Sequence, residues 1–169
     1  MKFLKESNYF INFLKKKKKL VIGSPAKGEA VSLDQVSDPT FSQEILGKGA
    51  AVIPAEGEIY APADGTVGMV FETLHAVSMT TENGAEILIH VGLDTVKLKG
   101  EGFTGHVKAG EKVRKGDLLL SVDLERIRKA GYDTIIPVVI CNTDQFASVV
   151  PAGGGNVAAG ADFIEIEEK

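Results

Sequence analysis

Two of the three histidines in the sequence, His75 and His90, stand on either side of a turn signal. A neutral imidazole has a lone pair on one ring nitrogen and titrates at about pH 6.5, so it is a nucleophile at the pH of the cell. It can attack a phosphoryl group directly, while a second imidazole beside it donates a hydrogen bond to the phosphoryl oxygens. The pair therefore predicts phosphoryl transfer through one ring with help from the other, and Thr73 is placed to orient the helping ring.

The turn signal is the dipeptide Asn83-Gly84, which lies between two runs of alternating apolar residues and is typical of a β-hairpin. A turn centred on this dipeptide pairs Val77 with His90. The same register places His75 opposite Gly92. Because side chains alternate along a strand, His75, Val77 and His90 are expected on one face, with the two histidines about 7–8 Å apart. A three-residue loop would shift this register and separate the rings. The opposite face, expected to be core, carries Ile87, Ile89 and Val91.

The sequence leaves other interpretations of the pair open. Histidines occur on half-buried sheet faces without any function. A zinc ion is another alternative, but two histidines fall short of the three or four protein ligands that zinc usually has, and neither Glu86 nor Asp94 completes a ligand spacing. We expect no intrinsic cofactor, and keep open a zinc ion (Zn2+) bound by His75 and His90 together with a partner's carboxylate. His106 lies in a turn-rich segment and is expected to be an exposed surface residue.

The composition of the chain indicates one globular domain. It has 169 residues, of which 44% are hydrophobic and 25% charged, enough to bury a single core. No apolar run approaches the roughly 20 residues of a membrane-spanning helix. Cys141 is the only cysteine, which excludes an internal disulfide and favours a reducing cytoplasm. It follows an apolar run, and we interpret it as a small buried hydrophobic residue rather than a phosphoryl-accepting cysteine.

Charge is unevenly distributed along the chain. Residues 1–20 contain seven lysines and one acidic residue, whereas the remaining 149 residues contain 12 basic and 22 acidic side chains. The acidic body argues against nucleic-acid binding, which requires a basic stripe, and suits a basic protein partner. We divide the chain into a basic amphipathic or disordered tail, residues 1–19, and a single domain, residues 20–169. Such a tail is typical of peripheral contact with an anionic membrane surface.

Beyond residue 20 the sequence reads as short strands separated by Gly, Pro, Asn and Asp at intervals of about 8–12 residues. This rhythm predicts an all-β fold, an antiparallel β-sandwich or barrel-sandwich. Residues 24–29 (SPAKGE) are echoed by residues 61–66 (APADGT), which indicates a sandwich built from related halves. Only short helical turns are expected, within residues 36–46 and 124–129. Strands are expected at residues 50–53, 57–61, 66–71, 86–91, 118–122, 134–140 and 163–166.

Three stretches around the histidines resemble a known family. They are FETLHA at residues 71–76, IHVGLDTV at residues 89–96 and LKGEGF at residues 98–103. Together they are similar to the glucose-class enzyme IIA component (EIIA type 1) of the bacterial phosphoenolpyruvate-dependent sugar phosphotransferase system. The resemblance runs from about residue 22 to the C-terminus. It implies a compact antiparallel β-sandwich with a shallow depression that has an apolar rim.

The resemblance also implies a reaction. HPr, a small carrier protein phosphorylated on histidine, passes its phosphoryl group to the tele nitrogen of His90. His90 then passes it to a cysteine on the IIB domain of a glucose-class sugar permease, so that sugar uptake is driven with phosphorylation. His75 stabilises the phosphoryl group without accepting it, and Thr73 supports His75. The implied partner-binding rim consists of Phe41, Phe71 and Val96, with Asp38 and Asp94 meeting basic residues of HPr.

Other functional classes were weighed against the phosphoryl carrier. A regulatory binding module would use the same face, unphosphorylated, to dock permeases or metabolic enzymes such as kinases. A biotinyl or lipoyl carrier domain is similar in residues 61–67 and 107–119, but it needs a lysine in a Met-Lys turn, and residues 118–126 contain none. A zinc peptidase on a similar sandwich needs a His-x-His cluster, which the sequence lacks.

Overall fold

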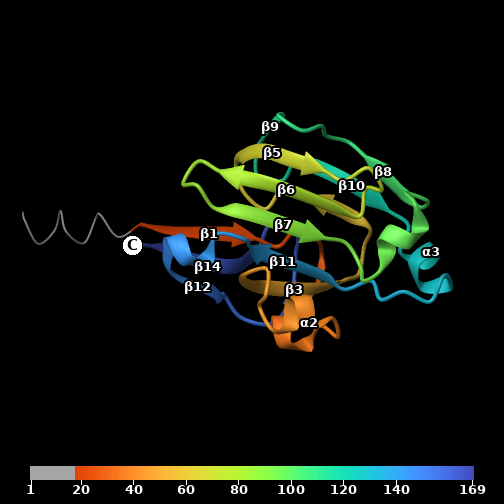
Figure 1. Ribbon diagram of the computed structural model, residues 1–169, viewed down its shortest axis with the longest axis horizontal. Coiled ribbons are helices and arrows are strands. Elements are labelled where there is room, and N and C mark those ends of the chain that lie inside the picture. The colour runs from red at the N-terminus through yellow and green to blue at the C-terminus, as the bar shows by residue number, and fades with distance from the viewer. Residues whose placement is uncertain (1–17) are drawn as a thin grey trace, which may run out of the picture.

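The computed structural model describes residues 18–169 as antiparallel β-sheets with a few short helices (Figure 1). The strands are β1 (Lys19–Gly23), β2 (Gly28–Val31), β3 (Lys48–Pro54), β4 (Glu58–Tyr60), β5 (Gly65–Val70), β6 (Ala76–Thr81), β7 (Glu86–His90), β8 (Phe103–Gly105), β9 (Lys112–Val113), β10 (Leu118–Val122), β11 (Ile136–Ile140), β12 (Phe146–Pro151), β13 (Gly155–Val157) and β14 (Asp162–Glu168). The helical turns are η1 (Leu33–Gln35), α2 (Pro39–Ser42), η2 (Thr95–Leu98), α3 (Leu124–Lys129) and η3 (Thr143–Gln145).

An eight-stranded sheet of order β13-β2-β3-β11-β7-β6-β5-β9 shares one core with two three-stranded sheets, β1-β14-β12 and β4-β10-β8. Ile89 of the large sheet, Leu119 of β10 and Phe163 of β14 all belong to this core and are at most 1% exposed. The strand β7 shows why these residues form a sheet, because its sequence EILIH alternates between the core and the opposite face. The predicted all-β antiparallel fold is confirmed.

A smaller apolar cluster covers the other face of the large sheet. Leu33 and Phe41, from the segment of η1 and α2, pack there against Ala51 of β3 and Val139 of β11. The helix α2 begins after Asp38, whose carboxylate accepts a hydrogen bond from the Thr40 backbone N–H at 3.0 Å and so caps its first turn. This cap fixes the direction in which Phe41 enters the sheet face.

Every strand expected from the sequence is present, and both expected helical regions contain a short helix. The hairpin register is the exception, because β6 and β7 pair Ala76 with His90 and Val77 with Ile89, one residue away from the expected register. Val77 is therefore a core residue, 1% exposed, and does not share a face with His90.

The shift arises at the hairpin turn, which has a three-residue loop. The Thr81 backbone N–H donates to the Ala85 carbonyl, and the Thr81 hydroxyl accepts from the Ala85 N–H. Gly84, with φ of +84°, supplies the left-handed residue that such a loop requires. From a distant segment, the Asn142 side chain donates to the Gly84 carbonyl and accepts from the Glu86 N–H. These contacts favour the three-residue loop over the two-residue turn.

Two other predictions from the sequence concern Cys141 and the N-terminal tail. Cys141 is exposed, so the prediction that it is buried was wrong. It is the first residue after β11, whose five residues are all buried, and the burial ends with the strand. The predicted tail lies outside the described residues except for Lys18 and Lys19. Within residues 18–169, no helix has the length and apolar character needed to cross a membrane.

Candidate phosphoryl-transfer site

His90 is the last residue of β7, on the face turned away from the main core, and is half-buried. Its Nδ1 lies 2.7 Å from the Gly92 carbonyl oxygen. A carbonyl oxygen can only accept, so Nδ1 carries the proton and donates it. The Nε2 atom then keeps its lone pair and is the nucleophilic nitrogen of this ring. The ring of Phe41 supports His90, with centroids 5.1 Å apart.

His75 precedes β6 and is 6% exposed. The residue before it, Leu74, has φ of +60°, a left-handed conformation that is uncommon for a bulky residue. On the other side of Leu74, the Thr73 hydroxyl lies 2.5 Å from His75 Nδ1. The ring of Phe71 meets the His75 ring edge-on, with centroids 5.2 Å apart.

The two imidazole rings are neighbours, with centroids 5.1 Å apart and an interplanar angle of 79°. The expectation that a three-residue loop would separate them was therefore wrong. His75 lies outside the regular strand, after the left-handed Leu74, and so escapes the alternation that sends Val77 into the core. Its backbone carbonyl still accepts from the Val91 N–H at 2.7 Å, which ties it to the residue that follows His90.

Burial lowers the pKa of both histidines below 6.5. Beyond burial, the neighbouring His90 lowers the pKa of His75 further, because two imidazolium ions would repel each other. The hydrogen bond to Gly92 raises the pKa of His90 and offsets part of the burial effect, as do the carboxylates of Asp38 and Asp94. Both rings are neutral at neutral pH, so each retains a lone pair for nucleophilic or basic chemistry.

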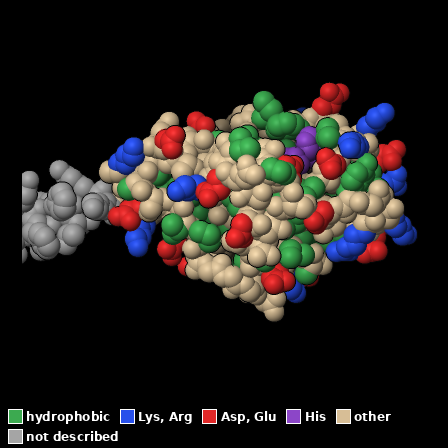
Figure 2. Space-filling model, turned by 60° about the horizontal axis from the view of Figure 1, so that its bottom comes forward, with side chains coloured by type: hydrophobic (Ala, Val, Ile, Leu, Met, Phe, Trp, Pro, Cys, Tyr) green, Lys and Arg blue, Asp and Glu red, His purple; other side chains and the backbone are tan. Residues whose placement is uncertain are grey.

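The predicted partner-binding residues around the histidine pair differ in exposure and in charge. Val96 is 47% exposed and Phe71 is half-exposed, so both offer apolar surface beside the rings. Phe41 is 3% exposed and packs beneath His90, which leaves its part in a docking rim a prediction. The carboxylates of Asp38 and Asp94 lie close enough to His90 to act on its charge. Figure 2 shows histidine at the molecular surface with hydrophobic and acidic side chains around it.

The described residues place no complete metal site here. Within residues 18–169, no group of three or more His, Cys, Asp or Glu side chains is arranged to hold a metal ion. His75 and His90 together supply two imidazole nitrogens, so a zinc ion between them would need ligands from elsewhere. The zinc ion shared with a partner's carboxylate stays a prediction. His106 is exposed, as predicted, and its Nε2 lies 2.8 Å from the Ser121 hydroxyl.

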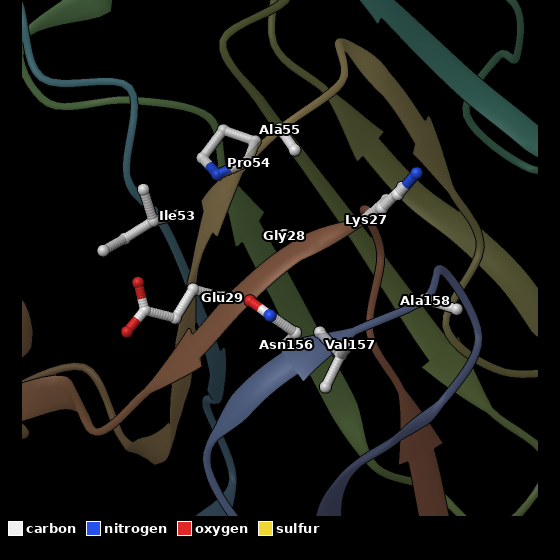
Figure 3. Close-up of a pocket in the computed structure, with 9 residues that line it drawn as sticks. All are labelled: Lys27, Gly28, Glu29, Ile53, Pro54, Ala55, Asn156, Val157 and Ala158. Atoms are coloured by element: carbon white, nitrogen blue, oxygen red, sulfur yellow. The ribbon is translucent and has the colours of Figure 1, made fainter.

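A separate hollow of about 610 Å³ lies where β2, β3 and β13 meet (Figure 3). It is lined by nine residues, Lys27, Gly28, Glu29, Ile53, Pro54, Ala55, Asn156, Val157 and Ala158. None of them is a histidine or a predicted site residue. The two neighbouring imidazole rings therefore lie outside this hollow.

Sequence reasoning missed the Gly92 carbonyl, the atom that sets the proton on His90. Gly92 was expected opposite His75, which the pairing of Ala76 with His90 contradicts. The sequence feature that could have indicated this bond is the position of Gly92 two residues after His90. The residue between them, Val91, is 0% exposed. A glycine two residues after a strand-terminal histidine allows the chain to turn so that its carbonyl meets the ring.

Comparisons with known proteins show what the chain is similar to. Residues 20–146 match the family described as phosphoenolpyruvate-dependent sugar phosphotransferase system, EIIA 1. The chain is 46% identical over 147 residues to a glucose-specific EIIA component from Oceanobacillus iheyensis, covering 87% of this chain and 89% of that protein. The fold is similar to the glucose permease IIA of Mycoplasma capricolum, with a TM-score of 0.83, 34% identity and coverage of 88% and 96%.

A further relative is the beta-glucoside-specific EIIBCA component of Bacillus subtilis, 54% identical over 127 residues. These residues are 75% of this chain, which spans about a fifth of that longer protein, 21%. The chain therefore belongs to the EIIA 1 family of the phosphoenolpyruvate-dependent sugar phosphotransferase system. The resemblance expected from the sequence is confirmed, and with it, at the level of the family, a phosphoryl carrier in sugar uptake.

Proposed function

We propose that this EIIA 1 protein accepts a phosphoryl group from phospho-HPr on Nε2 of His90 and donates it to a cysteine of a IIB domain of a glucose-class permease. The observation that supports this role is the hydrogen bond between His90 Nδ1 and the Gly92 carbonyl at 2.7 Å. It keeps the proton on Nδ1, so Nε2 is nucleophilic without prior proton transfer. A nucleophile prepared in this way suits a carrier that must load and unload rapidly.

In the loading step, the His90 Nε2 lone pair attacks the phosphorus of the donor phosphohistidine. A new nitrogen–phosphorus bond forms as the donor's nitrogen–phosphorus bond breaks, and the bonding pair stays on the donor imidazole. No proton moves and nothing is oxidised or reduced. Catalysis of such a loose transition state consists mainly of positioning and of stabilising charge on the equatorial oxygens.

His75 is the residue we assign to stabilising the phosphoryl group once it is on His90 and during its transfer to the IIB domain. When the Thr73 hydroxyl donates to His75 Nδ1, across their 2.5 Å contact, the His75 proton resides on Nε2 and can be donated to a phosphoryl oxygen. The ring lies beside His90, with centroids 5.1 Å apart. In the unloading step the same reaction runs toward the cysteine thiolate of the IIB domain, and His75 keeps its hydrogen bond to the oxygens in transit.

Partner docking is assigned to the surface around the rings. The apolar side chains of Phe71 and Val96 exclude water from the transfer, and the carboxylates of Asp38 and Asp94 attract a basic partner such as HPr. We propose that the protein works in the cytoplasm, where both partners would meet it. The predicted tail, residues 1–19, is proposed to add peripheral contact with the inner face of the membrane.

The test is incubation with phosphoenolpyruvate, enzyme I and HPr, followed by intact-mass measurement. We expect one acid-labile phosphoryl group on the wild type and none on His90→Ala. His106→Ala is the matched control, because it removes an exposed histidine far from the pair in sequence and should still be loaded. An unmodified wild type would show that the proposed function is wrong, and loading of His90→Ala would show that the acceptor is misassigned.

A further inference from the structure

The chain segment from Val91 to Leu93, which contains the peptide units Val91–Gly92 and Gly92–Leu93, connects the two histidines of the site. The Val91 N–H donates to the His75 carbonyl at 2.7 Å, and the Gly92 carbonyl accepts from His90 Nδ1 at 2.7 Å. Any rotation of these units would move the acceptor that determines which nitrogen of His90 carries the proton. The position of the Gly92 carbonyl must therefore be fixed by something outside the histidines.

The chain segment before β11 fixes one side of these peptide units. The Gly92 N–H donates to the Ile135 carbonyl at 3.0 Å, and the Leu93 N–H donates to the Asp133 carbonyl at 3.0 Å. The second bond holds the same peptide unit that carries the Gly92 carbonyl. The Asp133 carboxylate in turn accepts from the Ile135 N–H at 2.9 Å, which keeps this segment in the shape that receives both bonds.

Thr95 fixes the other side. It is 0% exposed, and its hydroxyl donates to the Val91 carbonyl at 2.5 Å. Its methyl group lies against the Gly92 backbone, since a Cβ added to Gly92 would come within 2.5 Å of Thr95 Cγ2. The Thr95 hydroxyl is therefore a hydrogen-bond donor, and the Thr95 methyl group is a packing surface. The Val91–Gly92 unit is held at both its polar groups, by Thr95 at the carbonyl and by Ile135 at the N–H.

We propose that Thr95 is a positioning residue for phosphoryl transfer, which holds the Gly92 carbonyl where it keeps the proton of His90 on Nδ1 and leaves Nε2 free. This inference rests on the proposed function for its kinetic consequence, but the position of the proton on His90 is a property of the free protein. Thr95 does not touch the phosphoryl group and acts through Val91 and Gly92. Its hydroxyl is the part that carries the effect.

Thr95→Val tests the proposal because valine keeps the shape and the methyl group but cannot donate. Nitrogen-15 NMR of the histidine rings, at a pH above their titration, reports which nitrogen of each ring is protonated. We expect wild-type His90 to be protonated at Nδ1, and Thr95→Val to show a mixture of both tautomers. The rate of loading from phospho-HPr should fall about ten- to a hundredfold, as for other small displacements of reacting groups. Thr95→Ser, which restores the hydroxyl, should return both readouts close to wild type.

Thr143→Val is the matched control. The Thr143 hydroxyl donates to the Ile140 carbonyl at 2.5 Å, a bond of the same kind in a part of the chain without site residues. We expect it to lower stability to a similar extent while the His90 tautomer and the loading rate stay unchanged. His106 provides an internal control, since its ring signals should not change in any of these variants.

A folded Thr95→Val with wild-type His90 tautomer and loading rate would overturn the proposal. If Thr95→Val does not fold, Thr95→Ala replaces it, with the same expected change in tautomer and the same overturning result. If the wild type fails to accept phosphoryl from HPr, the proposed function is wrong, but the tautomer measurement still decides the role of Thr95. The two failures are therefore distinguishable.

Discussion

The two histidines are held by different kinds of support. His90 ends a strand and is hydrogen-bonded to a backbone carbonyl, that of Gly92. His75 follows a left-handed leucine outside the strand and is hydrogen-bonded to a side-chain hydroxyl, that of Thr73. A carbonyl only accepts, whereas a hydroxyl both donates and accepts. The His90 support thus allows one tautomer, and the His75 support allows two.

This difference matches the two tasks proposed for the rings. A nucleophile that must always present the same lone pair is best served by a partner that cannot reverse its role. A ring that stabilises the bound phosphoryl group needs its proton on Nε2, and a hydroxyl that donates to Nδ1 keeps the proton there. The first support is a backbone carbonyl, which a substitution can alter only by moving the backbone, while the second is a side chain that a single substitution at Thr73 removes.

The largest expected effect comes from removing the rings themselves. His90→Gln should accept no phosphoryl group, because glutamine offers no comparable nucleophile. His75→Gln should still be loaded by HPr but donate to the IIB domain about 10²–10³-fold more slowly, the usual cost of losing one charge-stabilising donor. Single-turnover transfer measured separately for the two steps checks this. Loss of loading in His75→Gln with loading retained in His90→Gln would reverse the assigned roles.

Gly92→Ala should break the His90 support through its backbone. The added Cβ would lie 2.5 Å from Thr95 Cγ2 and 2.8 Å from the Asp133 carbonyl oxygen, at φ of +78°. The control is Gly84→Ala, which has φ of +84° but no atom within 4 Å of the added Cβ. We expect the control to lose about 1–2 kcal/mol from left-handed strain, and Gly92→Ala to lose about 1–3 kcal/mol more from overpacking. Urea unfolding checks this, and equal losses would show that the contact around Gly92 is loose.

Thr73→Val should break the His75 support without touching His90. Valine cannot donate to His75 Nδ1, so the ring is a poorer hydrogen-bond donor at Nε2. We expect unloading to a IIB domain to slow by about tenfold, less than the loss of the donor ring itself because Thr73 acts through His75, while loading from HPr stays near wild type. Thr73→Ser should restore unloading, and the exposed Thr80→Val on β6 serves as the control. Slowing of both steps alike would contradict the separate roles of the two supports.

The smallest expected effect is on the pH dependence of stability. Burial lowers the pKa of both histidines below 6.5, so the unfolded chain binds more protons as the pH falls through 6.5. Stability should therefore be greatest above pH 6.5 and decrease below it. Urea midpoints at acidic and neutral pH should differ less in the His75→Gln/His90→Gln double variant than in wild type. An unchanged pH dependence in the double variant would show that other groups carry it.

Much of this molecule could be predicted from its sequence, because the signals were local. The strand pattern predicts the sandwich, and the residues around both histidines identify the family. The hairpin register could not be predicted in the same way, since the three-residue loop depends on Asn142, 58 residues from Gly84. An Asn-Gly pair is compatible with a two-residue or a three-residue loop, and the distant contact with Asn142 favours the three-residue loop.

The geometry of the histidine site also depends on contacts that the local sequence does not reveal. Strand alternation predicts that the histidines meet, yet they meet because Leu74 adopts a left-handed backbone that its residue type disfavours. Strain of this kind depends on the surrounding packing, which includes contact of the Leu74 side chain with the main core. The role proposed for Thr95 could not be predicted either, because a buried threonine in a short helical turn has no sequence signature of its own.

One feature of the fold bears on how such a domain spreads among proteins. Among the described residues, the first and last strands, β1 and β14, pair with each other. The Asn83 side-chain amide, in the β6–β7 loop, donates to the Glu168 carboxylate at 2.9 Å. Both ends of the described chain thus lie beside the hairpin loop, while His90 lies at the far end of β7, about 15 Å away at the usual rise per residue. Figure 1 shows the two ends together on one side.

A gene fusion at either end would therefore add a neighbour on the side opposite the reacting rings. Linkers of any length could be joined there without shielding His90 or changing its support. The same closeness would let the two ends be joined and the chain reopened elsewhere by circular permutation. The domain can thus occur in separate and in fused proteins, with the reacting rings on the side away from the junction in each.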